Sequence, residues 1–368
     1  MALFIQKPIF WNINQYLAPS GVRGSSGFPK ATGYGHEEWN NSPKMLVTRG
    51  DHRFRVFHTE GLGAAPTDEN AGQTFVFLTA SHDRVQQLVG IAGNAFSLHG
   101  DHHRKQRESI VRELSLHQLW EDAWSVGNVQ KQYGGNQKKF LKAWEKDLHW
   151  IPNWICPEEF FWWFDKPITL DPRTITGKKK LLGMYSTYTD LDLPTVGRIL
   201  DAIPAELRTE QWDRLIDAIQ CAPSEPLPAE DLSDDKEPVT EVLTRVNARR
   251  GQGTFREDLM QVWGRACSVT GLACREILRA SHVMPWRDAN AKQRLDRHNG
   301  LLLLANLDAL FDKGLITFDS KGKMLVSKLL DERHRRALGL PQPLRFVPKE
   351  MEAYLKYHEE EVFQDNRT

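Results

Sequence analysis

The chain has 368 residues, and its 48 basic and 48 acidic side chains give a formal net charge of zero. A hydrophobic fraction of 40% is typical of a globular chain with two or three domains. No apolar run approaches the length of a membrane span, and residues 1–15 lack the basic-then-apolar layout of a signal peptide. We therefore expect a cytoplasmic protein with no membrane partner.

The four cysteines, Cys156, Cys221, Cys267 and Cys274, are widely spaced and form no CxxC pair. This spacing predicts neither a disulfide framework nor a structural zinc site. Cys267 and Cys274 could share a metal with His282, but two buried thiols that pack a small domain are the favoured interpretation.

Charge is segregated along the chain although the total is neutral. Basic runs lie at residues 104–112, 131–146, 173–180 and 245–256, and an acidic run lies at residues 225–237. Basic runs of this kind can bind a phosphate backbone, and an ordinary solvated surface is the alternative for any one of them. We expect Lys178, Lys179, Arg249 and Arg250 to contact the DNA backbone if the chain binds DNA.

The first 60 residues combine a predicted strand with a long glycine-rich segment. Residues 4–14 are rich in aromatic and β-branched side chains and predict a strand. Residues 20–42 contain many glycines together with Phe28, Tyr34 and Trp39. Glycines let a loop approach a ligand closely, and aromatic rings can stack on a base. A surface loop whose aromatic rings fold back beneath it is an equally good interpretation.

Short β-prone runs and helical runs alternate up to residue 219. Residues 54–59, 73–81 and 87–95 predict closely spaced strands of a small barrel or curled sheet. Helices are predicted at residues 109–127, 136–149, 194–202 and 206–219, an aromatic core segment at 157–164, and another strand at 181–188. Residues 222–238 combine prolines with carboxylates and few apolar groups, which predicts a linker.

Residues 282–312 carry the pattern that points most directly to chemistry. Residues 276–283 predict a strand that ends at His282, residues 299–305 an apolar run, and residues 307–313 a short helix stopped by Gly314. Asp308 and Asp312 are spaced to share one helical face and could both point at one hard cation. A histidine beside a divalent ion suits phosphodiester hydrolysis, because it can take a proton from water.

These residues resemble the HNH nucleases of the ββα-metal fold. The resemblance covers six blocks in order: RRGQGTFR at 249–256, CSVTG at 267–271, ASHVMPW at 280–286, LDRHNG at 295–300, and DALFD with KGLI over 308–316. It implies that His282 is the general base, that Asn299 orients the base or its loop, and that Asp308 occupies the last motif position. Many relatives carry a His there. An Asp, with or without Asp312, suits Mg²⁺ or Mn²⁺.

The front of the chain resembles the EVE domain, a PUA-like barrel that reads modified bases. The residues that carry this resemblance are the tryptophan-bearing first strand, GYGHEEWNNSP at 33–43 and QLVGIAGNA at 87–95. In EVE-HNH enzymes this domain precedes an HNH domain and directs cleavage to modified DNA. The resemblance implies an α+β protein: an EVE/PUA-like β-barrel with helices at 1–188, a helical segment and linker at 189–240, and an HNH endonuclease domain at 241–368.

By that resemblance the protein is a modification-dependent (type IV) restriction endonuclease. It would recognise 5-methylcytosine or 5-hydroxymethylcytosine in double-stranded DNA by base flipping. Candidate base readers, chosen by residue type, are Trp11, Asn12, Tyr34, Trp39 and Asn40. An HNH nuclease that reads unmodified sequence or DNA structure, and a non-catalytic DNA-binding protein, are the alternatives. We find no nucleotide-binding glycine loop. A single site cuts one strand per engagement, so we expect a homodimer.

Overall fold

Two compact units, Met1–Arg249 and Arg250–Thr368, make up the chain. The computed structural model describes residues 2–49, 52–63, 65, 67, 70–179, 181, 188–220, 255–286 and 288–365. The predicted linker at 222–238 and the basic residues Arg249 and Arg250 lie outside the described residues. We describe each unit by itself. No helix in the described ranges is long and apolar enough to cross a membrane.

The front unit is built on an eight-stranded sheet. Its strand order is β2-β3-β6-β5-β4-β1-β8, and β7 pairs with β5 off this path. The strands are β1 (Leu3–Pro8), β2 (Leu46–Arg49), β3 (His52–Phe57), β4 (Thr74–His82), β5 (Val85–Ser97), β6 (Trp154–Pro157), β7 (Phe161–Leu170) and β8 (Thr189–Asp190). β1 and β4 are parallel, whereas the other pairs are antiparallel.

The long strand β5 gives this sheet its curl. It pairs with β4 through residues 85–95, with β7 through residues 86–92 and with β6 through Phe96 and Ser97, and the pairings with β4 and β7 contain register shifts. Such shifts bend a strand and increase its twist. The presence of this sheet together with many helices confirms the mixed α+β class. A closed barrel is not found: the path of pairings among the described strands ends at β2 and at β8.

Both faces of the central strands are buried. Phe75 and Phe77 of β4 pack into one core, and Val76 and Leu78 pack into another, because successive side chains point to opposite faces of a sheet. All four are 0% exposed. This explains why the central part of the β-prone run at 73–81, residues 75–78, is continuously apolar rather than alternating.

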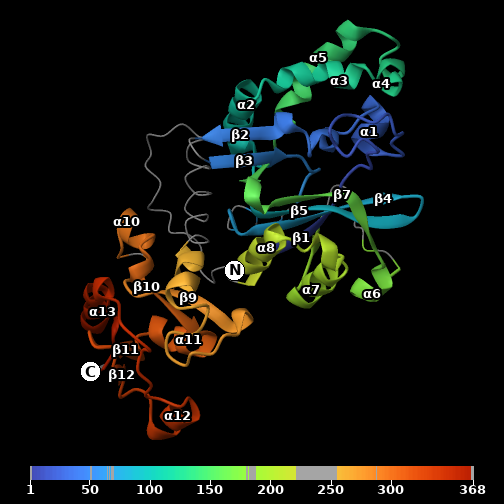
Figure 1. Ribbon diagram of the computed structural model, residues 1–368. Helices are drawn as coiled ribbons and strands as arrows, with labels where there is room; N and C mark the ends of the chain where they lie inside the picture. The colour runs from blue at the N-terminus through green and yellow to red at the C-terminus, as the bar shows by residue number, and fades with distance from the viewer. Residues whose placement is uncertain are drawn as a thin grey trace. The chain divides into compact units, whose positions relative to one another are not determined.

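Helices cover one face of the central strands. The first core includes residues of α7 (Leu193–Asp201) and α8 (Glu210–Gln220), and Figure 1 shows both helices together with α6 (Pro172–Thr176) on one side of the sheet. Asp192 caps α7, since its carboxylate accepts from the Thr195 N–H at 2.8 Å. Residues 189–220, expected to begin a separate helical segment, thus pack against the front sheet. The expected domain boundaries stay a prediction.

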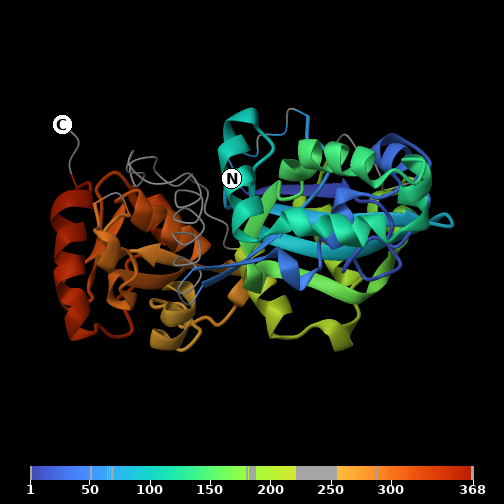
Figure 2. The same ribbon diagram turned by 90° about the horizontal axis from the view of Figure 1, so that it is seen from above.

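A second helical layer lies beyond β2 and β3. It contains α2 (Arg104–Glu113), α3 (Trp120–Trp124), α4 (Gly127–Gln132) and α5 (Gln137–Asp147), and Figure 2 shows it in teal and green across the strands. The continuous helix predicted at 109–127 is interrupted because Ser115 adopts a left-handed φ of 52°. The glycine-rich segment contains only a short helix, α1 (Gly27–Thr32), and a 3-10 turn at His36–Trp39.

The back unit contains two hairpins and several short helices. Residues 255–262 are helical, and β9 (Leu278–His282), α10 (Ala291–Arg294), β10 (Gly300–Leu304) and α11 (Ala305–Asp312) follow. The second hairpin is β11 (Ile316–Phe318) with β12 (Met324–Val326), and the closing helices are α12 (Glu332–Ala337) and α13 (Glu352–Tyr357). Leu301, Leu302, Leu303 and Phe311 form the core of this unit with Leu259 and Trp263.

Candidate active site

The β9–β10 hairpin and α11 form a ββα unit, labelled in Figure 1. β9 and β10 are antiparallel, and His282 at the end of β9 is paired with Gly300 at the start of β10. A Cβ at Gly300 would lie 2.5 Å from Cζ of Phe255 and 2.7 Å from Leu259. Glycine is therefore required here for the helix at 255–262 to pack onto the hairpin.

The imidazole of His282 is held on two sides. Its Nε2 lies 3.0 Å from the carbonyl oxygen of Arg294, and its ring stacks on Phe255 with centroids 4.0 Å apart. A carbonyl oxygen can only accept, so Nε2 carries the proton and Nδ1 carries the lone pair. Burial lowers the pKa of His282; the hydrogen bond to the Arg294 carbonyl opposes this change, and the nearby charge of Arg294 adds to it. The ring is thereby kept neutral, as a general base requires.

Asn299 holds the loop that connects the two strands. It is fully buried. Its Oδ1 accepts from the Met284 N–H at 2.7 Å, and its Nδ2 donates to the carbonyl oxygens of Gln293 at 3.0 Å and Met284 at 3.3 Å. Gln293 directly precedes Arg294, whose carbonyl orients His282. The amide of Asn299 therefore holds the carbonyl of Gln293, and the next carbonyl along the chain, that of Arg294, orients the imidazole of His282.

The two carboxylates of α11 lie near Ser281, the residue before His282. The Ser281 hydroxyl is 3.3 Å from Oδ1 of Asp312. Burial raises the pKa of Asp308, and a hydrogen bond from Ser281 and the charge of Arg279 oppose that rise. Asp308 is half-buried and Asp312 is exposed. Two carboxylates one helical turn apart supply hard oxygen ligands that suit Mg²⁺ or Mn²⁺.

Several residues that support this geometry were not singled out from the sequence. Phe255 stacks on His282, and the buried guanidinium of Arg256 donates to the Leu278 carbonyl at 3.1 Å at the start of β9. Both belong to the block at 249–256, so the motif itself marked them. Ser281 and Arg294 act through a hydroxyl and a backbone carbonyl, and residue type alone does not mark such contacts.

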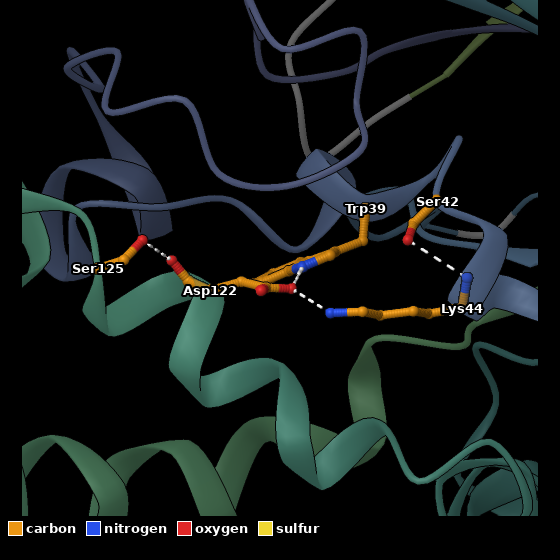
Figure 3. Close-up of polar contacts among 5 residues, drawn as sticks. All are labelled: Trp39, Ser42, Lys44, Asp122 and Ser125. Atoms are coloured by element: carbon orange, nitrogen blue, oxygen red, sulfur yellow. Dashed lines mark hydrogen bonds and ion pairs between the residues drawn. The ribbon is translucent and has the colours of Figure 1, made fainter.

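Tyr34 and Trp39, two of the candidate base readers, lie in the core of the front unit. Trp39 is 0% exposed, and its ring contacts those of Tyr34 and Trp144 edge-on. Figure 3 shows the Nε1–H of Trp39 donating to the carboxylate of Asp122 at 3.1 Å, where Lys44 also binds at 2.8 Å. Both the ring and the indole N–H of Trp39 are therefore engaged in contacts within the core.

The two candidate asparagines are also engaged internally. Asn12 accepts from the backbone N–H groups of Asn14 and Tyr16 and donates to Glu38 at 2.9 Å. Asn40 pairs with both backbone groups of His58, at 2.7 and 2.9 Å. Their amides therefore stabilise loops.

Trp11 is the candidate ring that differs from these. It is half-buried, and it stacks on His82 at 5.2 Å with an interplanar angle of 7°. Its Nε1–H is buried without a hydrogen-bond partner among the described residues. The structure does not bring Trp11, Tyr34 and Trp39 together as one stacked set. Lys178 and Lys179 are exposed just after α6.

The back unit thus has an antiparallel hairpin with a histidine at the end of its first strand, followed by a helix that carries two carboxylates, an arrangement that suits metal-dependent phosphodiester hydrolysis. The comparison with protein families agrees. Residues 267–319 match the model of the HNH endonuclease family. The match supports an HNH endonuclease domain, a hydrolase that acts on DNA and that in this family generally depends on a divalent metal. No curated protein matches the chain.

Proposed function

We propose that the protein is a metal-dependent DNA endonuclease that cuts near 5-methylcytosine or 5-hydroxymethylcytosine in double-stranded DNA. The nuclease part rests on one observation above all, the orientation of His282. Its Nε2 is bound to the carbonyl of Arg294, which leaves Nδ1 with a lone pair. That proton arrangement is the one a general base needs.

In this mechanism the chain's own residues position and deprotonate a water molecule. Nδ1 of His282 takes the proton as the water oxygen attacks phosphorus, and the bond between phosphorus and the leaving oxygen of the cut strand breaks. Asn299 acts as a positioning residue, because its amide holds the peptide at Gln293 next to the carbonyl that orients His282. Asp308 and Asp312 would hold a divalent ion, which when bound stabilises the charge on the scissile phosphate and the leaving oxygen.

The reading of modified cytosine is assigned to the front unit. Its support is the resemblance to EVE domains and the curled sheet, together with the half-buried ring of Trp11, whose Nε1–H has no partner among the described residues. A methyl group on cytosine adds only an apolar contact, so direct contact discriminates by about 1–3 kcal/mol. Flipping the base into a closed site adds selection by shape.

Assembly and backbone contacts complete the proposal. One HNH site holds one base and cuts one strand per engagement, so a double-strand break by a homodimer is expected. Lys178 and Lys179, exposed after α6, would contact the DNA backbone and position the duplex without reading its sequence. Sedimentation with and without a modified duplex tests the dimer, and a strict monomer that only nicks DNA would rule it out.

The deciding experiment is digestion of matched methylated, hydroxymethylated and unmodified plasmids in Mg²⁺, Mn²⁺ or EDTA. We expect cleavage of modified plasmid in either ion and none in EDTA. Equal cleavage of all plasmids would favour a nuclease that reads unmodified sequence or structure. Absence of cleavage under every metal condition, with binding retained, would favour a DNA-binding protein without catalysis.

A further inference from the structure

A second group of metal-binding side chains lies in the front unit, outside the nuclease motif. Glu37 belongs to the 3-10 turn at His36–Trp39, and His58 and Glu60 follow β3. One ligand atom from each lies within 4.8 Å of the other two. Glu37 is 1% exposed, His58 is 4% exposed and Glu60 is half-buried. Buried ionisable groups at this density require an internal partner.

The hydrogen bonding of His58 leaves one of its ring nitrogens with a free lone pair. Its Nδ1 lies 2.7 Å from the carbonyl oxygen of Trp150, so Nδ1 carries the proton and Nε2 carries the lone pair. Nε2 is buried and has no hydrogen-bond partner among the described residues. A histidine whose second nitrogen donates to a backbone carbonyl is the arrangement that metal-binding imidazoles adopt.

Glu37 and its neighbour Glu38 differ in how their carboxylates are satisfied. Glu38 accepts from the N–H and hydroxyl of Ser20, the amide of Asn12 and the N–H of Gly35, all within 3.0 Å. Oε2 of Glu37 is buried and has no partner among the described residues. Burial and the nearby charge of Glu60 raise the pKa of Glu37 to about 8, and a backbone hydrogen bond and the charge of Lys7 oppose that rise only in part. The carboxylate of Glu38 therefore has its hydrogen bonds, whereas one oxygen of Glu37 is buried without a partner among the described residues.

The charge of Lys7 acts on both Glu37 and Glu60. Nζ of Lys7 donates to the carbonyl oxygen of Gly61 at 2.7 Å, beside Glu60. One ammonium group balances one carboxylate, and two carboxylates are present. The ammonium group of Lys7 can only donate hydrogen bonds. A metal ion, in contrast, can accept electron pairs from both Nε2 of His58 and the carboxylate oxygen of Glu37.

We propose that Glu37, His58 and Glu60 bind a divalent first-row transition ion. An imidazole nitrogen with two carboxylate oxygens suits Zn²⁺ or Mn²⁺ better than Mg²⁺, which prefers oxygen ligands and retains its waters. Ligand atoms at ~2.1 Å from a common ion are at most ~4.2 Å apart, so the group closes onto an ion through shifts of less than ~1 Å. The ion joins the His36–Trp39 turn to the segment after β3, the two segments that Asn40 also joins.

The test uses the full chain carrying Asp308→Ala and Asp312→Ala, which removes the candidate nuclease ligands. This parent is stripped with EDTA, and Zn²⁺, Mn²⁺ or Mg²⁺ is then titrated against a chromophoric chelator. Glu37→Gln and His58→Asn are added singly. Glu121→Gln and His117→Asn, exposed groups of the same types in the same unit, are the matched controls. Circular dichroism reports the folding of every variant.

We expect the parent to bind one equivalent of Zn²⁺ or Mn²⁺, at least tenfold weaker binding in Glu37→Gln and His58→Asn, and unchanged binding in both controls. A parent that binds neither ion, that prefers Mg²⁺, or that binds as tightly after either substitution overturns the proposal. If the two variants do not fold, the thermal midpoint of the parent decides. It should rise with added Zn²⁺ or Mn²⁺, because a ligand that binds only the folded state stabilises it. No rise overturns the proposal.

Discussion

In each unit a backbone carbonyl fixes which ring nitrogen of one histidine carries the proton, but the two histidines have different surroundings. In the back unit, Nε2 of His282 is bound to the Arg294 carbonyl at 3.0 Å. In the front unit, Nδ1 of His58 is bound to the Trp150 carbonyl at 2.7 Å. Each contact fixes the proton on one nitrogen and a lone pair on the other. His282 is half-buried and can meet a water molecule, whereas His58 is almost fully enclosed and faces two carboxylates.

The units also differ in how far apart in sequence their site residues lie. His282, Asn299, Asp308 and Asp312 fall within one hairpin and the helix after it. The group in the front unit joins a turn at His36–Trp39 to a segment after β3, and it is oriented by Trp150 from beyond α5. A site built on consecutive elements leaves a readable motif. A site assembled by long-range packing leaves none.

The largest effect is expected from the base of the nuclease. His282→Ala should lower the cleavage rate about 10²- to 10⁴-fold, the usual contribution of a general base. DNA binding in EDTA should be retained. Single-turnover cleavage of a modified duplex measures the rate, and His334→Ala, an exposed histidine of α12, is the matched control. Cleavage near the wild-type rate in His282→Ala would remove this assignment.

The two carboxylates of α11 should differ in importance. Asp308 is half-buried and burial raises its pKa, whereas Asp312 is exposed. We expect Asp308→Ala to lose at least tenfold more activity than Asp312→Ala and to respond less to added Mg²⁺ or Mn²⁺. Metal titrations of the cleavage rate measure this, with the exposed Glu350→Ala as the control. Equal losses would show that both carboxylates bind the metal to the same extent.

Acid should weaken the back unit through His358. Its ring stacks on Phe311 at 3.7 Å, and Nδ1 lies 2.8 Å from the Thr317 hydroxyl. Burial lowers the pKa of His358 from its ordinary value of 6.5 to about 4. The unfolded chain therefore binds this proton first. The contribution of neutral His358 to the free energy of unfolding is therefore complete above pH 6.5. It falls by roughly 3 kcal/mol between pH 6.5 and 4 and changes no further below pH 4.

Hydrogen exchange of peptides from β11, measured between pH 7 and 4 and corrected for the intrinsic rate, reports this change within the back unit. His358→Gln should be less stable than wild type at pH 7 and should lose less stability on acidification. A wild-type protein and a variant with parallel pH profiles would show that His358 does not titrate as its burial implies.

The smallest effect concerns the choice of DNA by the front unit. In a His282→Ala background, Trp11→Ala should lower the preference for modified over plain duplex by about 1–3 kcal/mol if its ring stacks on a flipped base. Lys178→Ala should weaken both duplexes alike, because a phosphate contact carries no sequence information. Fluorescence anisotropy at one stated salt concentration measures both. An unchanged preference in Trp11→Ala would exclude this ring as the reader.

Trp39→Ala provides the contrast within the front unit. Removal of a tryptophan that is 0% exposed should cost about 3–5 kcal/mol of stability. Any effect of Trp39→Ala on the preference for modified DNA should follow from loss of folding. A denaturant midpoint measured alongside the binding separates an effect on stability from an effect on base recognition. A normal midpoint with a lost preference would place Trp39 in the base site.

The sequence by itself determined the parts of this protein whose chemistry is local. The order His282, Asn299, Asp308 and Asp312 predicted a strand end, a loop and one helical face, and the structure has β9, β10 and α11 in that order. Helix period and strand pairing act over a few residues, so this geometry follows from spacing. The β-prone run at 73–81 likewise predicted a strand, observed as β4.

Only the tertiary structure decided what the front unit does with its polar and aromatic residues. Trp39 and Tyr34 were chosen for their type, yet packing against Trp144 places them in the core. The helix expected at 109–127 breaks at Ser115, and the expected barrel is a curled sheet whose described path stays open. Glu37 and Glu38 are adjacent and chemically identical. The carboxylate of Glu38 is satisfied because Ser20 and Asn12, which lie 18 and 26 residues away in the sequence, donate to it together with the neighbouring Gly35 N–H. The contacts from Ser20 and Asn12 depend on the folded chain rather than on local spacing.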